Sequence, residues 1–398
     1  MRILSIGSLY PPHHHGGAEL IWRSAVEHEE KHGHEVRVLT TTTRVENPDE
    51  GLGEGRDVHR DLPWYWSQHQ FPRLAHRRRL ALERESIRTL DRHLADFRPE
   101  AVVFWSMGGM SLSLLERVRA AGLPAVGVLL DDWLTYAPEV DQWQRTRARL
   151  GPLGGLLARA AGAPARLDLA TAARWVFMSR TLRDQVTAAG LDVAAARIAL
   201  RGIDRDGFPP APERRWTGRL IYLGRVEARK GVAVAIEALA GLPDMSLRVV
   251  GPEEPRYGAE LRELADSLGL AGRVSFETLP RADLPRALAE SDALLFPVVW
   301  PEPWGLVPLE AMASGLPVVA SGRGGSGEYL RDRENCLIYA QAEDSSALAA
   351  QITELAASPE LRRHLRAGGL QTSSSLSAES FNDEVLDEIL SAVEAGRG

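Results

Sequence analysis

The sequence predicts an α/β protein built from two doubly wound units. Short apolar runs with strand composition alternate with longer stretches of helical periodicity. This alternation is typical of parallel sheets covered by helices. A segment dense in proline and charge, residues 201–216, interrupts the alternation, which then starts again, as expected of a linker between domains. The length of 398 residues also suits two domains better than one core.

The first half of the chain begins with a predicted buried strand and a glycine-containing loop. The strand covers residues 2–7, the loop covers 8–17, and a helix follows over 18–31. Gly16 and Gly17 end the loop, and two glycines at this point could bring the backbone close to a ligand. The remaining predicted elements of this half are strands at 36–41, 101–105, 124–130 and 175–179, helices within 139–173 and a helix at 181–189.

The second half repeats the pattern. Its predicted strands are 220–223, 246–250, 274–277 and 293–299, and its predicted helices are 231–240, 259–268, 284–290 and a helix that starts at 306. We therefore expect an N-terminal domain over residues 1–205 and a C-terminal domain over 206–374. Because parallel strands present ligands at their carboxyl ends, residues that follow a strand are the candidates for a site.

Composition excludes several classes of function. The net charge of -7 and the pI of about 5.9 do not indicate a nucleic-acid partner. The one cysteine, Cys336, cannot form an internal disulfide and fits a reducing compartment. The N-terminus lacks the apolar core of a signal peptide, and no run approaches the length of a membrane span. These features predict a cytoplasmic location.

Two glutamates frame a strand–loop–helix junction in the second half. Glu302 lies in the loop after the 293–299 strand, and Glu310 lies eight residues later, about one turn inside the next helix. Between them, Gly305 and Leu306 would present free N–H groups at a helix start, which suits anionic or hydroxyl-rich ligands. A carboxylate accepts the two hydrogen bonds that a diol donates. The alternative, two solvated glutamates on an ordinary helix, stays open on these residues alone.

Two cations stand near the first strand of the second half. Arg225 follows the 220–223 strand, and Lys230 precedes the 231–240 helix. An arginine binds phosphate through a planar fork, and a lysine adds a compact charge. The alternative is a solvated turn; Glu227 and Arg229, within the same run, are predicted to be surface residues.

Three further patterns of the sequence are ambiguous. Asp131 and Asp132 follow the 124–130 strand, and at most one of them is expected to face a substrate, because neighbours on extended backbone point in opposite directions. The histidines at 13–15 invite a metal hypothesis, but adjacent side chains do not easily share one ion, so a loop beside a polar site is preferred. The GxGxxG pattern within 322–327 is weak evidence for dinucleotide binding and is interpreted as a turn.

Residues 62–92 combine an aromatic cluster with a run of arginines. Such a segment could contact a phosphorylated acceptor or an anionic membrane surface, which would make the protein membrane-associated. The favoured interpretation is a helix with a solvated arginine face beside an aromatic anchor. The segment contains Trp64, Tyr65, Trp66, His69, Phe71, Arg73, Arg77, Arg78, Arg79, Arg84 and Arg88.

The stretch PEPWGLVPLEAMASGLPVVAS closely resembles the signature of glycosyltransferase family 4, with its Glu-x7-Glu motif. The resemblance is strongest over residues 218–339 and includes a Gly-Arg-x4-Lys-Gly pattern and a Gly-Gly-x-x-Glu turn (Gly324, Gly325, Glu328). Upstream matches are Pro11, Pro12, Gly16, Gly17, Glu19, Ser179 and Arg201–Asp204. The resemblance implies the GT-B fold: two Rossmann-like domains facing a central cleft, the acceptor on the first, the donor mainly on the second, and a last helix (375–398) that crosses back onto the first.

The resemblance also implies roles for residues. Glu302 would hold hydroxyls of the donor sugar and Glu310 the ribose of the nucleotide, while Arg225 and Lys230 hold the diphosphate. To this set we add Asp132, which the resemblance does not assign and which we expect near the acceptor hydroxyl, as the remaining catalytic residue. The donor sugar and phosphates would also contact Gly16, Gly17, Pro303, Trp304, Gly305, Leu306 and Val307, and further sugar or acceptor contacts are expected from Asp131, Trp133 and His15.

The chemistry implied is transfer of a hexosyl-type group from a nucleotide sugar to an acceptor hydroxyl with retention at the anomeric carbon. The attack is expected on the front face, without a metal or cofactor, and the acceptor could be a small molecule, natural product, lipid or glycan. Asp131 stands where the family commonly has histidine, which leaves the donor sugar open. Alternatives are an epimerase or phosphorylase of the same architecture, or a non-catalytic nucleotide-sugar-binding subunit. A nicotinamide dehydrogenase is more distant, and the oligomeric state is not indicated.

Overall fold

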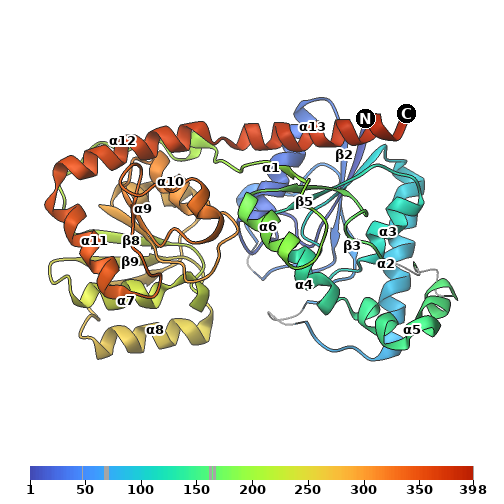
Figure 1. Ribbon diagram of the computed structural model, residues 1–398, viewed down its shortest axis with the longest axis horizontal. Helices are drawn as coiled ribbons and strands as arrows, with labels where there is room; N and C mark the ends of the chain where they lie inside the picture. The colour runs from blue at the N-terminus through green and yellow to red at the C-terminus, as the bar shows by residue number, and fades with distance from the viewer. Residues whose placement is uncertain (47, 67–70, 161–163, 165–166, 398) are drawn as a thin grey trace. The chain divides into compact units, whose positions relative to one another are not determined.

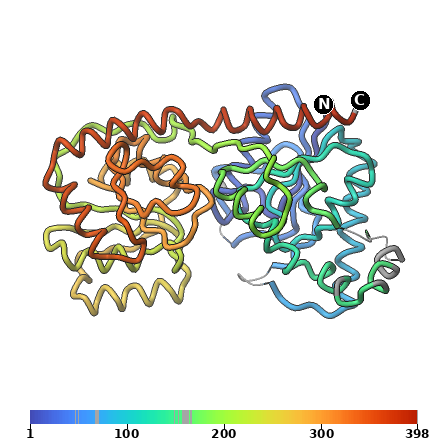
Figure 2. Tube along the Cα trace, viewed as in Figure 1, coloured from blue at the N-terminus to red at the C-terminus, as the bar shows by residue number. Residues whose placement is uncertain are grey.

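The computed structural model describes residues 1–46, 48–66, 71–160, 164 and 167–397, and it divides the chain into two compact units (Figure 1). The first unit comprises Met1–Leu200 and Phe381–Gly398, and the second comprises Arg201–Ser380. Figure 2 follows the chain through the first unit (blue to green), the second unit and the red terminal helix.

The boundaries between the units differ from the expected ones at 205 and 374. Residues 201–204 belong to the second unit, where one side-chain contact and one backbone bridge hold them. The indole Nε1 of Trp304 donates to the carbonyl of Arg201 at 2.5 Å, and Ile203 forms a parallel bridge with Ser377. The same bridge keeps residues 375–380 in the second unit. Composition alone carries no signal for such pairings.

The first unit contains a seven-stranded parallel sheet in the order β3-β2-β1-β4-β5-β6-β7. The chain runs outward from β1 in both directions, so the order reverses between β1 and β4, which is the arrangement of a doubly wound sheet. The strands are β1 (Arg2–Ile6), β2 (Glu35–Thr41), β3 (Val58–Leu62), β4 (Ala101–Phe104), β5 (Ala125–Leu129), β6 (Arg174–Phe177) and β7 (Arg197–Ile198).

Helices connect most of these strands. They are α1 (Gly17–Lys31), α2 (His76–Phe97), α3 (Ser113–Ala120), α4 (Trp133–Val140), α5 (Gln142–Ala160), α6 (Arg180–Ala188) and α13 (Ala378–Arg397), whose first residues belong to the second unit. A short 3-10 turn lies at Glu50–Leu52. The sequence did not predict β3, β7, α3 or most of α4. The two strands lie at the edges of the sheet, and β3, with the sequence VHRDL, is mostly half-buried, so it lacks an apolar run.

A buried serine organises the aromatic core of the first unit. The indole nitrogens of Trp22 and Trp105 both donate to Oγ of Ser5, at 2.7 and 3.1 Å. Ser5 lies on β1 and is fully buried. One hydroxyl thus satisfies two indole N–H groups that would otherwise be costly to bury.

The second unit contains a six-stranded parallel sheet in the order β10-β9-β8-β11-β12-β13, which reverses between β8 and β11. Its strands are β8 (Arg219–Leu223), β9 (Ser246–Val250), β10 (Val274–Glu277), β11 (Ala293–Phe296), β12 (Val318–Ala320) and β13 (Leu337–Ile338). Its helices are α7 (Val232–Ala240), α8 (Pro255–Ser267), α9 (Leu284–Ala289), α10 (Val307–Ala313), α11 (Ser345–Ala357) and α12 (Pro359–Ser375). The predicted architecture of two doubly wound units is confirmed.

Apolar sequence explains the burial of helix α7 in the second unit. Helix α7 reads VAVAIEALA, and Val232, Ile236 and Leu239 are at most 1% exposed. Burying each such side chain contributes about 1.5–3 kcal/mol. Among the residues that the structure describes, no helix combines the length and the apolar character needed to cross a membrane.

Candidate functional site

In the second unit, the predicted donor residues gather where the strand order reverses. Arg225 and Lys230 follow β8, and Glu302 follows β11, which is the direct neighbour of β8 in the sheet. Because both strands are parallel, their carboxyl ends lie at the same edge. The topology thus brings together residues that are 72 positions apart in the sequence.

Lys230 and Glu302 form a close, largely buried ion pair. The Lys230 ammonium Nζ lies 2.5 Å from Oε2 of Glu302, and the side chains are 14% and 13% exposed. The indole Nε1 of Trp300 donates to the same carboxylate oxygen at 2.7 Å. Two donors therefore fix the orientation of the Glu302 carboxylate.

Nearby carboxylates partly neutralise the positive charges of this site. Burial lowers the pKa of Lys230, and the nearby carboxylate of Glu302 opposes that shift. The carboxylate oxygen Oε1 of Glu227 lies 2.7 Å from Nε of Arg229 and 3.5 Å from Nη2 of Arg225. Glu227 and Arg229, which were predicted to be surface residues, have side chains that are 24% and 41% exposed and form an ion pair with each other.

A glycine turn supports the backbone of Glu302. The N–H of Gly325 donates to the carbonyl of Glu302 at 2.6 Å. Gly324 has φ +72°, and a Cβ there would lie 2.3 and 2.4 Å from the backbone O and N of Glu302. Only glycine permits this conformation and this approach. Residues 324–328 form a short 3-10 turn, so the GxGxxG pattern does not open a long helix, as the turn interpretation expected.

Glu310 lies in the first turn of α10 and has a charged partner. Its Oε1 accepts from Nη2 of Arg281 at 3.0 Å. The Glu310 side chain is 4% exposed and that of Arg281 is 49% exposed, so the arginine can move away while the carboxylate stays in place. Sequence reasoning missed Arg281, because the contact joins residues 29 positions apart and no motif indicates it.

The junction between Glu302 and Glu310 offers mostly backbone to a ligand. Pro303 and Trp304 are buried, and the Trp304 indole is held by the Arg201 carbonyl, so its side chain does not face solvent. Residues 305–307 are half-buried and lie where α10 begins. Their amides have no carbonyl one turn earlier in the helix.

In the first unit, Gly16 and Gly17 stand in open surroundings at the start of α1. A Cβ on either glycine would meet no other atom within 4 Å. His15, the residue before them, is exposed, and its ring centroid lies 5.0 Å from that of Trp66. Trp66 in turn stacks on Trp64 at 4.9 Å. The loop after β1 is thus flanked by an aromatic row that no sequence motif had linked to it.

The histidines at 13–15 diverge. His13 is buried, and its ring nitrogen Nε2 lies 3.0 Å from the guanidinium nitrogen Nη1 of Arg44. His14 lies 3.9 Å from a carboxylate oxygen of Asp49, and His15 packs on the aromatic row. Three different partners explain why these neighbours do not converge on one centre.

The acidic pair after β5 has two different environments. Asp131 accepts from the hydroxyl of Tyr136 at 3.2 Å, and Asp132 immediately precedes α4, where its carbonyl accepts from Thr135 at 2.7 Å. Both aspartates are half-buried. Trp133 is 0% exposed and packs edge-on against Trp175, so the expectation that its side chain contacts sugar or acceptor is wrong. The strand ends at Leu129, and the chain then bends, which turns the indole inward.

The basic segment forms the amphipathic helix α2. Leu82, Ile87 and Leu90 are buried. The exposed side chains on and before the helix include Arg73, Arg77, Arg78, Arg84 and Arg88. This is the solvated arginine face of the favoured interpretation, while acceptor or membrane contact through 62–92 stays a prediction. His69 and the other residues at 67–70 lie outside the described residues.

Comparison with known proteins gives matches along most of the chain. A model of group 1 glycosyl transferases matches residues 213–372, and a model of a glycosyl transferase 4-like domain matches residues 16–202. The first covers the cluster around Lys230, Glu302 and Glu310, and the second begins at Gly16.

Curated relatives match over part of their length. The chain is 31% identical over 204 residues to the GDP-mannose-dependent alpha-(1-6)-phosphatidylinositol monomannoside mannosyltransferase of Mycolicibacterium smegmatis, covering 46% of this chain and 53% of that protein. It is 35% identical over 173 residues to the lipopolysaccharide core biosynthesis glycosyltransferase LpsE of Rhizobium meliloti, covering 43% and 49%. The chain thus spans about half the length of these curated relatives.

Solved structures share the fold over the whole chain. Sucrose-phosphate synthase of Thermosynechococcus elongatus superposes with a TM-score of 0.72 at 19% identity, covering 97% of both chains. Anabaena HepE in complex with UDP and glucose gives 0.69 at 21% identity, covering 97% of this chain and 98% of that one. Identities this low establish the fold alone. The two family models, which match residues 16–202 and 213–372, show that the chain belongs to glycosyltransferase family 4, and the solved structures show that it has the GT-B fold.

Proposed function

We propose that this protein is a retaining glycosyltransferase, which moves a hexosyl-type group from a nucleotide sugar to an acceptor hydroxyl. The contact between Lys230 and Glu302, beside Arg225 at the strand reversal, carries the proposal. It pairs a cation suited to phosphate with a carboxylate suited to sugar hydroxyls. Two curated relatives are named as glycosyltransferases, and one structural neighbour holds UDP and glucose, which supports a nucleotide-sugar donor.

Lys230 and Arg225 are the proposed diphosphate ligands. As the glycosidic bond breaks, negative charge develops on the leaving diphosphate, and fixed cations stabilise it. Lys230 is already in place in a largely buried setting, where its charge interacts more strongly than in water. Arg225 is exposed and can close onto the phosphates when the donor binds. We propose that these two side chains supply the positive charge of the reaction, with no metal or other cofactor.

Glu302 and Glu310 are the proposed sugar and ribose ligands. Glu302 is oriented by Trp300 and Lys230 through one oxygen, Oε2. Donor hydroxyls would share this carboxylate. Glu310 would accept from the ribose once Arg281 swings away or shares the carboxylate; the carboxylate is buried, whereas the arginine side chain is 49% exposed.

The acceptor is proposed to bind at the first unit. Asp132 is the candidate nearest to the acceptor hydroxyl, with Asp131 and His15 as further contacts, and Gly16 and Gly17 allow close approach of a ligand. In front-face attack the departing phosphate oxygen takes the acceptor's proton. The acceptor oxygen bonds to the anomeric carbon on the side that the phosphate leaves, so configuration is retained.

A donor screen tests the proposal. UDP-, GDP-, ADP- and TDP-sugars are added to the wild type and to Glu310→Ala, with Glu263→Ala on the exposed face of α8 as a matched control. A donor at a hundred times its dissociation constant should stabilise by about 2.7 kcal/mol, visible as a shift in melting temperature. We expect one nucleotide series to stabilise the wild type and the control but not Glu310→Ala.

Turnover then separates the alternatives. A transferase releases nucleotide only with an acceptor and gives a product of the donor's anomeric configuration. An epimerase gives product from donor alone, a phosphorylase needs free phosphate, and a binding subunit shows stabilisation without turnover. No stabilisation by any nucleotide sugar would overturn the proposal.

A further inference from the structure

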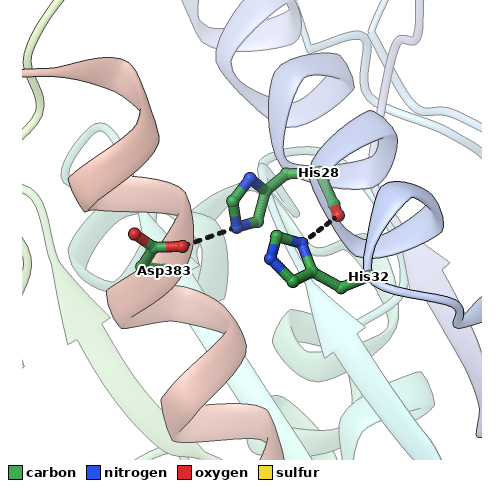
Figure 3. Close-up of side chains that lie close together, drawn as sticks. All are labelled: His28, His32 and Asp383. Atoms are coloured by element: carbon green, nitrogen blue, oxygen red, sulfur yellow. Dashed lines mark hydrogen bonds and ion pairs between the residues drawn. The ribbon is translucent and has the colours of Figure 1, made fainter.

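Two histidines and an aspartate of the first unit, none of them assigned to the proposed donor site, lie close together. His28 lies in the last turn of α1, His32 follows that helix directly, and Asp383 lies on α13. Figure 3 shows the two imidazoles side by side, with His28 turned toward the carboxylate of Asp383. One ligand atom from each residue lies within 4.8 Å of the other two. We call these three residues the histidine–aspartate cluster.

The contact between His28 and Asp383 is close but is not a well-formed hydrogen bond. Nε2 of His28 lies 2.8 Å from Oδ1 of Asp383. This nitrogen is buried, and it has no hydrogen-bond partner in suitable geometry. A buried nitrogen beside a carboxylate, without a directed N–H bond between them, is the pairing that two ligands of one cation would show.

The second histidine has a defined tautomer. Nδ1 of His32 lies 2.8 Å from the backbone carbonyl of His28, and a carbonyl only accepts, so Nδ1 carries the proton. Neutral His32 therefore has its lone pair on Nε2. Metal-ligating histidines commonly make this bond from their other nitrogen to a backbone carbonyl. The two rings are already close, with centroids 4.2 Å apart.

The third ligand is held in position by its neighbours on α13. Asn382 donates to the carbonyl and hydroxyl oxygens of Ser24 on α1, at 3.2 and 2.9 Å. Phe381 and Val385, on the same helix, are fully buried in the first unit. Asp383 is thus presented to α1 while its own side chain stays 54% exposed, which gives an ion access from solvent.

We propose that the histidine–aspartate cluster binds a divalent late first-row metal ion, with zinc as the best fit, and that the ion fastens α13 to α1. Two imidazole nitrogens and one carboxylate oxygen suit zinc, whereas magnesium and calcium prefer oxygen ligands alone. Three protein ligands leave one position for water. Ligand bonds of about 2.0–2.2 Å require the exposed side chains of His32 and Asp383 to move inward slightly.

The role of this ion is structural rather than chemical. His28 lies near the opposite end of α1 from Gly17, and at 1.5 Å rise per residue the two are about 16 Å apart along the helix. The ion is therefore separate from the proposed transfer reaction. A metal that binds the folded protein only stabilises it, so we expect the ion to retain α13 on the first unit.

A second histidine cluster in the described residues is a weaker candidate and a useful control. His59, Asp61 and His93 also lie within 4.8 Å of one another, by ligand atoms. Asp61, however, is paired with Arg92 at 3.0 Å, and Nε2 of His59 lies 2.6 Å from Asp57. A cation would have to displace the arginine there. Asp383 pairs with no arginine or lysine in the described part of the chain.

The test uses the full chain, stripped of metal with a chelator. Zinc binding is measured by isothermal titration calorimetry and by melting temperature, with magnesium as the negative control. We expect one equivalent of zinc to bind and raise the melting temperature. His32→Ala and Asp383→Asn, at exposed positions that tolerate change, should each weaken zinc binding by roughly tenfold or more. His59→Ala and His76→Ala, an exposed histidine on α2, should bind as the wild type does.

Cobalt gives an independent signature. Bound to the wild type, Co²⁺ should show visible d–d absorption that His32→Ala loses. If zinc neither binds the wild type nor raises its melting temperature, the cluster is an ion pair only. If His59→Ala abolishes binding and His32→Ala does not, the ion belongs to the other cluster. Either result would overturn the inference, and neither touches the transfer assay, in which a chelator should leave turnover unchanged.

Discussion

Substituting Lys230 with methionine removes the ammonium beside Glu302 and keeps most of the side chain's volume. Glu302 then retains Trp300 as a donor, but the proposed leaving diphosphate loses its buried cation. Removing one preorganised electrostatic partner of a developing charge costs about 10²–10³ in kcat, or about 2.7–4 kcal/mol. We expect Lys230→Met to lie in this range, with KM for the donor changed less than kcat.

The cost in stability should be smaller. Breaking a fully buried ion pair costs about 3–5 kcal/mol. Here both side chains keep some exposure, and burial already penalises the ammonium, so about 1–2 kcal/mol is expected after this discount. Chemical denaturation measures this term separately from turnover, and a variant that is folded but slow is the expected result.

Arg229→Met is the matched control for charge. Its guanidinium lies 4.1 Å from the centroid of the Trp300 ring and is paired with Glu227, so it reaches the phosphates less directly. We expect a loss of less than tenfold. If Lys230→Met keeps its kcat within threefold of the wild type, or if Arg229→Met loses as much, the assignment of Lys230 fails.

The pH profile gives a second test of the same residue. Burial lowers the pKa of Lys230, so the ammonium is lost at a lower pH than the ordinary 10.5. On the alkaline side of the pH profile, activity should therefore begin to fall below pH 10.5. Lys230→Arg should shift this fall to a higher pH. Between the lowered pKa and 10.5 the unfolded chain binds more protons, so the contribution of Lys230 to stability rises with pH there.

Three further predictions concern other parts of the molecule. Gly324→Ala should lower the free energy of unfolding and the initial rate of turnover more than Gly322→Ala does. Both positions have positive φ, but only a Cβ at Gly324 would press against the Glu302 backbone. Equal losses in the two variants would contradict this role of Gly324. Gly17→Ala should leave the melting temperature unchanged or higher, because nothing lies near the added Cβ, while raising KM; an unchanged KM would argue against close ligand approach. Burial, with the neighbouring Asp141, raises the pKa of Glu83, so its stabilising contribution is present below the unfolded pKa near 4.5 and is lost as pH rises through the raised folded value. As pH rises across that window, the free energy of unfolding of Glu83→Gln should increase relative to the wild type by at most about 1.4 kcal/mol per pH unit. A constant difference between the two proteins at every pH, measured by chemical denaturation, would contradict this prediction.

The local pattern of apolar residues was sufficient to predict the fold class. The strand at Ser246–Val250 and the strand at Val274–Glu277 have the predicted bounds, because apolar runs between helical stretches leave few alternatives. The edge strand Val58–Leu62 was missed because its sequence, VHRDL, has no apolar run, and it pairs with only one other strand. An apolar strand pattern reflects burial inside a sheet, and a strand at the edge of the sheet is only partly buried.

The candidate site could be predicted in its motifs but not in its partners. Glu302 and Lys230 were named from the sequence, whereas their contact depends on adjacent strands of a folded sheet. Arg281 beside Glu310 has no local signal. Trp133 was misjudged because its direction depends on a backbone bend after the strand. Such features depend on tertiary geometry, which no spacing in the sequence specifies.

The first unit is discontinuous in the chain, and this has a consequence for synthesis. Phe381–Gly398 joins it only after Arg201–Ser380 has been made. At usual rates of translation, the ribosome needs on the order of ten to forty seconds for that intervening stretch. Through this interval the surface that receives Phe381, Val385 and Ile389 is uncovered, so a nascent chain is exposed to aggregation and chaperone binding until its last helix emerges.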